Sequence, residues 1–190
     1  MTEIQETRLP EVKILTPRKF GDERGFFSEV WNKNVLDAAG ITDNFVQDNH
    51  AYSAEKGTVR GLHYQLEPKA QGKLVRVTRG AVMDVAVDIR VGSPTFGEHV
   101  SVELSAENWR QLWVPAGFAH GYCTLTENVE FLYKVTNDYS PAHEGGIIWN
   151  DPALGINWGL PSDNILLSDK DKILLPLAAQ TDLFTYGDKP

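Results

Sequence analysis

A histidine and a lysine that lie close together in the sequence are the first candidates for active-site chemistry. His63 lies in the strand-like segment 60–65 (RGLHYQ), and Lys73 follows ten residues after it. An imidazole titrates near neutral pH and can act as a general base, and a lysine supplies a fixed positive charge. A histidine in a strand is nevertheless more often a structural hydrogen-bond partner, and a lysine at a strand end is usually solvated. The chemistry of the pair therefore depends on the side chains around it.

The two faces of this strand set a geometric condition for a site. Successive side chains of a strand point to opposite faces, so His63 shares a face with Val59 and Gln65 while Arg60 points the other way. His63 and Arg60 can serve one site only if the strand bends or bulges at Gly61.

Three polar side chains in other strands are further candidates. Tyr133 shares a face with Phe131, which points it inward, where its hydroxyl needs a hydrogen-bond partner. It is either a core tyrosine or part of a site. Gln47 and Asn49 share a face expected to be apolar. Their amides suit either recognition of a planar polar group such as a nucleobase or a buried structural network.

A metal site is an alternative use of the histidines. A His-x-His site in a barrel requires a second histidine two residues after the first, a nearby carboxylate and a later histidine. Here the pair reads His63-Tyr64-Gln65, and only the later histidine, His120, is present in a turn that leads back into a strand. Two imidazoles without a well-placed carboxylate bind a divalent ion poorly, so we expect no metal.

Short strands must position these side chains. Runs of β-branched and aromatic residues between Gly, Pro and Asn predict strands at 45–52, 58–65, 73–78, 81–89, 99–104, 111–114 and 129–135. Residues 81–89 alternate between an apolar face with Val85 and Val87 and a face with Asp84 and Asp88.

Helices are few and short in this prediction. Asn32 can cap a helix that Gly40 ends, and Ser168 can cap one that begins at Asp169. No repeat or linker divides the chain, so residues 1–190 are predicted to form one domain. The expected fold is mainly β, an antiparallel sandwich or barrel with short peripheral helices.

Composition limits the classes of function. The chain has 190 residues, is 42% hydrophobic and carries a net charge of −8; its length suffices for one full core. The negative charge argues against non-specific nucleic-acid binding, although a local Arg and Lys cluster can bind an anionic small molecule. The single cysteine, Cys123, fits a reducing cytosol. Without an apolar signal core or membrane-length apolar run, we expect a soluble cytoplasmic protein.

Nine segments occur in order over nearly the whole chain: 22–29 (DERGFFSE), 47–49 (QDN), 59–65 (VRGLHYQ), 72–73 (GK), 118–122 (FAHGY), 132–134 (LYK), 138–139 (DY), 148–152 (IWNDP) and 167–171 (LSDKD). Their combination is far more specific than any one of them. Together they closely resemble the dTDP-4-dehydrorhamnose 3,5-epimerases of the cupin superfamily.

This resemblance implies a cupin-type jelly-roll barrel, a homodimer formed partly by strand exchange, and no cofactor or metal. The implied substrate is dTDP-4-dehydro-6-deoxy-D-glucose, a dTDP-4-keto-6-deoxyhexose, epimerised at C3 and C5. His63 would be the base, Asp171 its orienting carboxylate, Tyr133 the acid on the opposite sugar face, and Lys73 the cation facing the C4 oxygen. The resemblance assigns the other substrate contacts to His120 near the sugar, to Arg24, Arg60 and Lys170 at the diphosphate, to Tyr139 stacked on thymine, and to Glu29, Gln47, Asn49 and Glu144 near the nucleoside.

These implied roles agree with the chemistry. C3 and C5 both flank the C4 ketone, so deprotonation at either carbon gives an enolate whose charge a nearby cation stabilises. Relatives that epimerise only C3 or only C5 share the same residues, and Asp169 is a second choice for the carboxylate. A catalytically silent nucleotide-sugar-binding barrel and a metal-dependent barrel enzyme are the alternatives from other classes.

Overall fold

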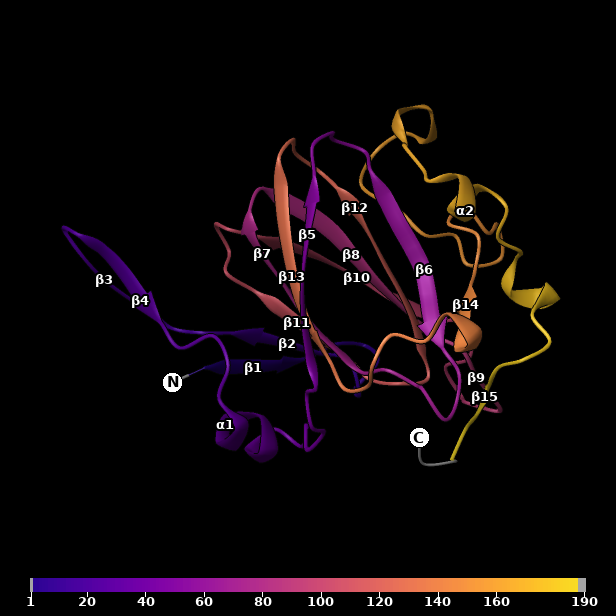
Figure 1. Ribbon diagram of the computed structural model, residues 1–190, viewed down its shortest axis with the longest axis horizontal. Coiled ribbons are helices and arrows are strands. Elements are labelled where there is room, and N and C mark those ends of the chain that lie inside the picture. Colours follow the sequence, from indigo (N-terminus) through magenta and orange to yellow (C-terminus); the bar gives the residue numbers. More distant parts are fainter. Residues whose placement is uncertain (1, 188–190) are drawn as a thin grey trace.

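Two antiparallel sheets build the molecule, which we describe from a computed structural model over residues 2–187 (Figure 1). The first sheet has the order β1 (Glu3–Glu6), β2 (Lys13–Thr16), β11 (Gln111–Val114), β7 (Lys73–Arg79), β13 (Val129–Val135) and β5 (Gln47–Ser53). The second has the order β10 (His99–Ser105), β8 (Ala81–Asp88), β12 (Phe118–Thr124), β6 (Val59–Gln65) and β14 (Glu144–Gly146). The predicted antiparallel barrel with few short helices is confirmed.

Two smaller pairs of strands complete the fold. β3 (Lys19–Asp22) and β4 (Gly25–Ser28) form a hairpin that projects away from the barrel (Figure 1). β9 (Arg90–Val91) pairs in parallel with β15 (Phe184–Thr185), which fixes the chain near its C-terminal end.

The seven predicted strands correspond to β5, β6, β7, β8, β10, β11 and β13, and the bounds of β11 and β13 coincide with the prediction. β12 was expected only as a strand following a turn. Every residue of β12 is buried, so the alternation that marks a half-exposed strand is absent. The strands β1, β3 and β4 are almost wholly exposed, so they also lack alternation, in their case because both faces meet solvent.

Two apolar layers of the core lie on the two faces of the five-stranded sheet, and a third, smaller cluster of Leu15, Leu36, Ile41, Leu74 and Trp113 lies on the other face of the six-stranded sheet. Val82 and Ala86 of β8 pack into the layer between the two sheets, whereas Val85 and Val87 pack into the layer beneath the C-terminal segments. Both faces of β8 are therefore buried. Asp84, on the same face as Val82 and Ala86, has no exposed surface.

Both predicted helices are present and begin at the predicted caps. The Asn32 side chain accepts a hydrogen bond from the backbone N–H of Asn34 at the start of α1 (Lys33–Ala38). Ser168 does the same for Asp171 in α2 (Asp169–Lys172). Three 3₁₀ turns, Pro141–His143, Ser162–Asn164 and Leu177–Ala179, lie in the connections. Within residues 2–187, no helix is long and apolar enough to span a membrane.

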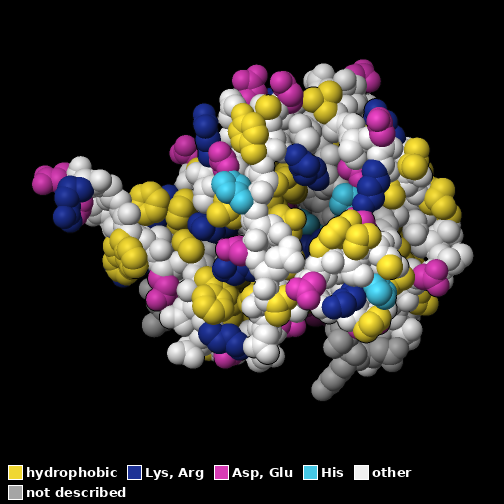
Figure 2. All heavy atoms as spheres, viewed as in Figure 1, with side chains coloured by type: hydrophobic (Ala, Val, Ile, Leu, Met, Phe, Trp, Pro, Cys, Tyr) yellow, Lys and Arg dark blue, Asp and Glu magenta, His cyan; other side chains and the backbone are white. Residues whose placement is uncertain are grey.

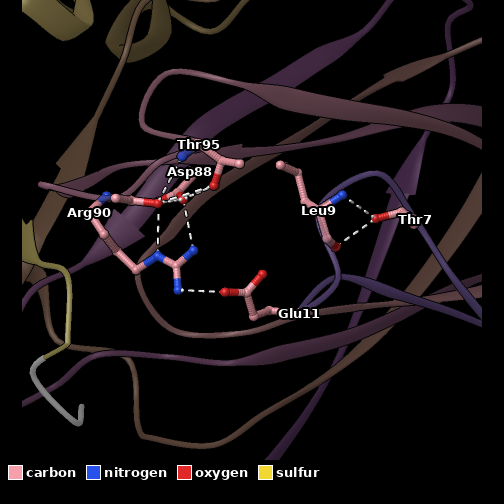
Figure 3. A network of polar contacts seen from close by, with 7 residues as sticks. Thr7, Leu9, Glu11, Asp88, Arg90 and Thr95 are labelled. Atoms are coloured by element: carbon pink, nitrogen blue, oxygen red, sulfur yellow. Dashed lines mark hydrogen bonds and ion pairs between the residues drawn. The ribbon is translucent and has the colours of Figure 1, made fainter.

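An ion-pair network centred on the buried Asp88 fixes the end of β8 (Figure 3). Asp88 accepts hydrogen bonds from Arg90, Ser93 and Thr95 at 2.6–2.9 Å, and Arg90 also contacts Glu11 at 3.1 Å. Burial would raise the pKa of Asp88, but these hydrogen bonds outweigh it and lower that pKa. The carboxylate therefore stays charged and connects β8 and β9 with the loop before β2.

Candidate active site

One cavity of about 530 Å³ brings together most of the side chains singled out by the sequence. Its walls come from both sheets and from the segment that contains α2. In Figure 2, Lys, Arg and His side chains border the hollowed area between β5 and α2. Seven predicted site residues line this cavity: Arg60, His63, Lys73, His120, Tyr133, Lys170 and Asp171.

The predicted break in the strand at Gly61 is confirmed. His63 pairs with His120 and Arg60 pairs with Tyr122, so three steps along β6 oppose two along β12. Gly61 has a φ of +120°, and a Cβ atom there would lie 2.6 Å from the Cα of Gly121. This bulge lets Arg60 and His63 reach the same cavity.

His63 and Asp171 form a close hydrogen-bonded pair. Nε2 of His63 lies 2.6 Å from Oδ1 of Asp171, whose side chain is 4% exposed. Burial would raise the pKa of Asp171, but hydrogen bonds from His63, Ser168 and the Gly61 backbone outweigh it and lower that pKa. The neighbouring Asp169 is fully exposed and contacts Lys172, so Asp171 and not Asp169 is the carboxylate that contacts the imidazole.

Lys73 is enclosed in the cavity wall and is not the solvated strand-end lysine that position alone suggests. Its Nζ lies 3.4 Å from the backbone oxygen of His63. The Lys73 side chain keeps some accessible surface, but the surrounding protein lowers its pKa to about 8. The negative charges of Asp84 and Glu144 act in the opposite direction and raise that pKa. At neutral pH the amine is therefore still mostly a cation.

Tyr133 points inward from β13, as its parity predicts. Its ring lies against Phe131 with the centroids 6.0 Å apart. Burial raises the pKa of the Tyr133 phenol, and Arg60 partly offsets this, so the hydroxyl is protonated at neutral pH. Because β13 and β6 belong to different sheets, Tyr133 and His63 enter the cavity from different walls.

His120 is paired with a carboxylate that the sequence did not single out. Its Nε2 lies 2.9 and 3.1 Å from the two carboxylate oxygens of Asp84. The only signal in the sequence is that an acidic residue interrupts the apolar run of β8. That signal alone does not distinguish a buried partner from a solvated one.

Three of the expected thymine and nucleoside contacts, Gln47, Asn49 and Tyr139, border a second, adjoining cavity of about 310 Å³ that shares Tyr133 with the first. Gln47 and Asn49 line it, and the Gln47 amide donates to Oδ1 of Asn49 at 2.7 Å. Tyr139 lies at its edge, 56% exposed, and its hydroxyl donates to Glu144 at 2.9 Å. Tyr139 thus has an open ring face beside two amides.

Glu144 connects the two cavities. Besides the Tyr139 hydroxyl, its Oε2 accepts a hydrogen bond from Nζ of Lys170 at 2.5 Å. Lys170 lines the first cavity and Tyr139 the second.

Arg24 and Glu29 are not brought to either of these cavities. Arg24 lies at the turn of the projecting β3–β4 hairpin and pairs with Asp22. Glu29 accepts a hydrogen bond from Asn32 at 3.1 Å. Within one chain neither residue lines the two cavities, so their contact with the nucleotide stays a prediction. Among residues 2–187, no group of three or more His, Cys, Asp or Glu side chains is arranged to hold a metal ion.

Comparison with known proteins gives a consistent result. The sequence profile described as dTDP-4-dehydrorhamnose 3,5-epimerase matches residues 6–179. The Shigella flexneri dTDP-4-dehydrorhamnose 3,5-epimerase is 59% identical over 167 residues, which are 87% of this chain and 91% of that protein. The dTDP-4-dehydrorhamnose 3-epimerase of Streptomyces niveus is more distant, 36% identical over 169 residues, 88% of this chain and 80% of that protein.

The solved structures agree. The crystal structure of dTDP-6-deoxy-D-glucose-3,5-epimerase from Legionella pneumophila in complex with dTDP-4-keto-L-rhamnose is 48% identical and superimposes with a TM-score of 0.93. The match covers 99% of this chain and 100% of the Legionella pneumophila chain.

Proposed function

Because this chain belongs to the dTDP-4-dehydrorhamnose 3,5-epimerase family, we propose that its cavity converts dTDP-4-dehydro-6-deoxy-D-glucose into dTDP-4-dehydro-L-rhamnose. The enzyme is an epimerase of dTDP-sugars. The single observation that carries the reaction is the convergence of His63, Lys73 and Tyr133 on one cavity from separate strands. We assign the catalytic domain to residues 1–190.

His63 removes the proton from the substrate carbon. Asp171 accepts the Nε2–H of the ring, so Nδ1 is left as the basic nitrogen. The C–H bond breaks, its proton moves to Nδ1, and its electron pair forms the C=C bond of an enolate. Asp171 stabilises the resulting imidazolium, because its lowered pKa keeps it an anion throughout.

Lys73 stabilises the charge that this step creates. As the C4 carbonyl becomes an enolate oxygen, the ammonium gains an interaction that it did not have with the neutral ketone. The hydrogen-bonded position of Nζ beside the His63 backbone oxygen holds the cation next to the base. We propose that no metal or cofactor is needed for this step.

Tyr133 completes the inversion. Its neutral hydroxyl donates a proton to the opposite face of the enolate carbon, so the configuration changes and the C4 ketone is restored. The His63 imidazolium then loses its proton and Tyr133 regains one, which leaves the enzyme unchanged. The same cycle at the second carbon adjacent to C4 gives the doubly inverted product.

Double epimerisation is favoured over a reaction at one carbon. The 3,5-epimerase from Shigella flexneri is 59% identical, whereas the 3-epimerase from Streptomyces niveus is 36% identical. The shared catalytic residues do not by themselves choose between the two outcomes, so a reaction at C3 alone or C5 alone is the second candidate.

The nucleotide occupies the adjoining cavity in this proposal. Tyr139 stacks on the thymine, Gln47 and Asn49 address the nucleoside, and Arg60 and Lys170 bind the diphosphate between the two cavities. Arg60 and Lys170 supply the local positive charge that a dianionic ligand requires in a chain of net charge −8.

A homodimer accounts for the two residues that stay outside these two cavities. Arg24 lies in the turn of the β3–β4 hairpin and Glu29 directly follows β4, and the hairpin carries three exposed aromatic residues, Phe20, Phe26 and Phe27. We propose that this hairpin packs on a second copy and delivers both side chains to its nucleotide.

The free, buried Cys123 supports a cytoplasmic location.

The direct test is turnover by the purified protein with excess chelator present. Product formed at an undiminished rate supports the metal-independent epimerase. Binding of dTDP without any turnover would instead identify a silent nucleotide-binding barrel, and loss of turnover in chelator that added metal restores would identify a metal enzyme.

A further inference from the structure

Asp84 is a buried carboxylate beside the cavity that the proposed reaction does not use. It lies on the barrel-facing side of β8, among the apolar side chains Val82 and Ala86, and has no exposed surface. An isolated carboxylate in such a place would be strongly destabilising. Its presence therefore requires a partner of the opposite charge or a strong hydrogen-bond donor.

The first partner is His120. Both oxygens of Asp84 lie within hydrogen-bond distance of Nε2, at 2.9 and 3.1 Å, so that nitrogen carries the hydrogen. The ring also lies over Phe131, 6.4 Å between centroids with the planes 29° apart. These contacts fix the imidazole and leave Nδ1 as its only free nitrogen.

The second group is Lys73, which lines the same cavity as the His120 ring that Asp84 binds, so the Asp84 carboxylate also acts on the lysine charge. Burial lowers the pKa of Lys73 to about 8, while Asp84 and Glu144 oppose this. Burial likewise raises the pKa of Asp84, and His120 and Lys73 oppose this. The other titratable or charged groups that line the cavity with Lys73 are His63 and Arg60 on β6, Tyr122 on β12, Tyr133 on β13, and Lys170 and Asp171 on α2.

We propose that Asp84 is a positioning residue of the enzyme: it fixes His120 against the sugar cavity and supplies the negative charge that balances Lys73. This inference rests on the proposed function, because the balance matters only if Lys73 must be a cation when the enolate forms. Asp171 does not replace Asp84 in this role, since its Oδ1 is engaged by His63.

The experiment is the pH dependence of kcat for Asp84→Asn, which keeps the shape of the side chain and removes its charge. Activity that requires protonated Lys73 falls as pH rises through the pKa of that lysine. Without the Asp84 charge this basic limb should move to lower pH by roughly one unit. A basic limb at the wild-type position would overturn the proposal.

Asp88→Asn is the matched control. Asp88 lies on the same strand and the same face as Asp84 and is also wholly buried, but its partners are those of the network in Figure 3. We expect a lower melting temperature and an unchanged basic limb. An equal shift of the limb in this variant would assign the effect to loss of stability and contradict the proposal.

Two further measurements cover failure of the variant or of the proposed reaction. If Asp84→Asn does not fold, His120→Asn removes the partner of Asp84 and leaves the carboxylate charge in place. The basic limb of kcat against pH should then stay at its wild-type position or move to higher pH, and a shift of that limb to lower pH would overturn the proposal.

If the wild-type protein has no turnover, the proposed function fails. Nitrogen-15 NMR of the ligand-free protein still tests Asp84, with an Nε2–H tautomer of His120 expected and an Nδ1–H tautomer contradicting it.

Discussion

His63 and Asp171 are 108 positions apart in the chain, yet Nε2 of the histidine lies 2.6 Å from Oδ1 of the aspartate. The bulge at Gly61 places the imidazole, and the Ser168 cap of α2 places the carboxylate. The central pair of the proposed reaction therefore depends on two local backbone features that are distant in sequence.

Replacement of Asp171 by Asn should lower kcat by roughly 10²–10⁴, because an amide no longer fixes the Nδ1-basic tautomer or stabilises the imidazolium. Steady-state kinetics with the dTDP-keto-sugar measures the effect. Asp169→Asn is the control, since Asp169 lies two residues away on the same helix and contacts only Lys172. Equal losses in the two variants would contradict the assignment.

Lys73→Ala should reduce kcat by roughly 10²–10³ and change KM little, because the lost contact strengthens only as the enolate forms. Lys134→Ala provides the comparison. Lys134 follows Tyr133 on β13 but pairs with Asp48 outside the cavity, and its removal should leave kcat unchanged. An effect of Lys73→Ala confined to KM would assign Lys73 to ground-state binding.

The activity of the wild-type enzyme should fall as pH rises through about 8, the value to which burial lowers the pKa of Lys73. The sign follows from the role: the protonated amine stabilises the enolate, so its deprotonation removes the effect. A profile of kcat against pH measures it. A kcat that stays constant up to the ordinary range of lysine, near 10.4, would show that Lys73 is not enclosed in the way described.

Gly61→Ala should abolish most activity and destabilise the fold. A Cβ atom would lie 2.6 Å from the Gly121 Cα and 2.7 Å from the His120 oxygen, at a φ of +120°. Gly92 also has a positive φ, +86°, but nothing lies within 4 Å of its Cβ position. Gly92→Ala should therefore cost only about 1 kcal/mol and keep kcat, as thermal unfolding and kinetics would show. Activity retained by Gly61→Ala would refute the role of the bulge.

Strands could be predicted where side chains alternate or where turn residues bound a short run of β-forming residues. β13 shows such alternation, and its bounds were predicted correctly. β12 is buried throughout and contains Gly121, so neither alternation nor an uninterrupted β-forming run delimits it; β11 is buried throughout as well, but it is a short run that Pro115 ends, and its bounds were predicted correctly. The hairpin of β3 and β4 could not be delimited because nearly all of its residues are exposed. Alternation in sequence reports a difference between two faces, and neither segment has one.

The site was predictable in part for a similar reason. The inward position of Tyr133 and the need for a break at Gly61 follow from strand parity. The contact between His63 and Asp171 came only from the family resemblance, because no local rule relates residues so far apart. Asp84 was recognised as one of two acidic residues on a strand face, but whether that face met water or the barrel interior depended on the packing of the second layer.

The most direct test of the account is the reaction of the purified protein with dTDP-4-dehydro-6-deoxy-D-glucose in D₂O, followed by NMR at C3 and C5. Each inversion removes a substrate proton and returns one from the solvent pool, so the account predicts deuterium at both carbons. It also predicts greatly reduced incorporation for His63→Asn and no product of inverted configuration for Tyr133→Phe. Deuterium at only one carbon would contradict double epimerisation, and its absence from both carbons would contradict the enolate mechanism itself.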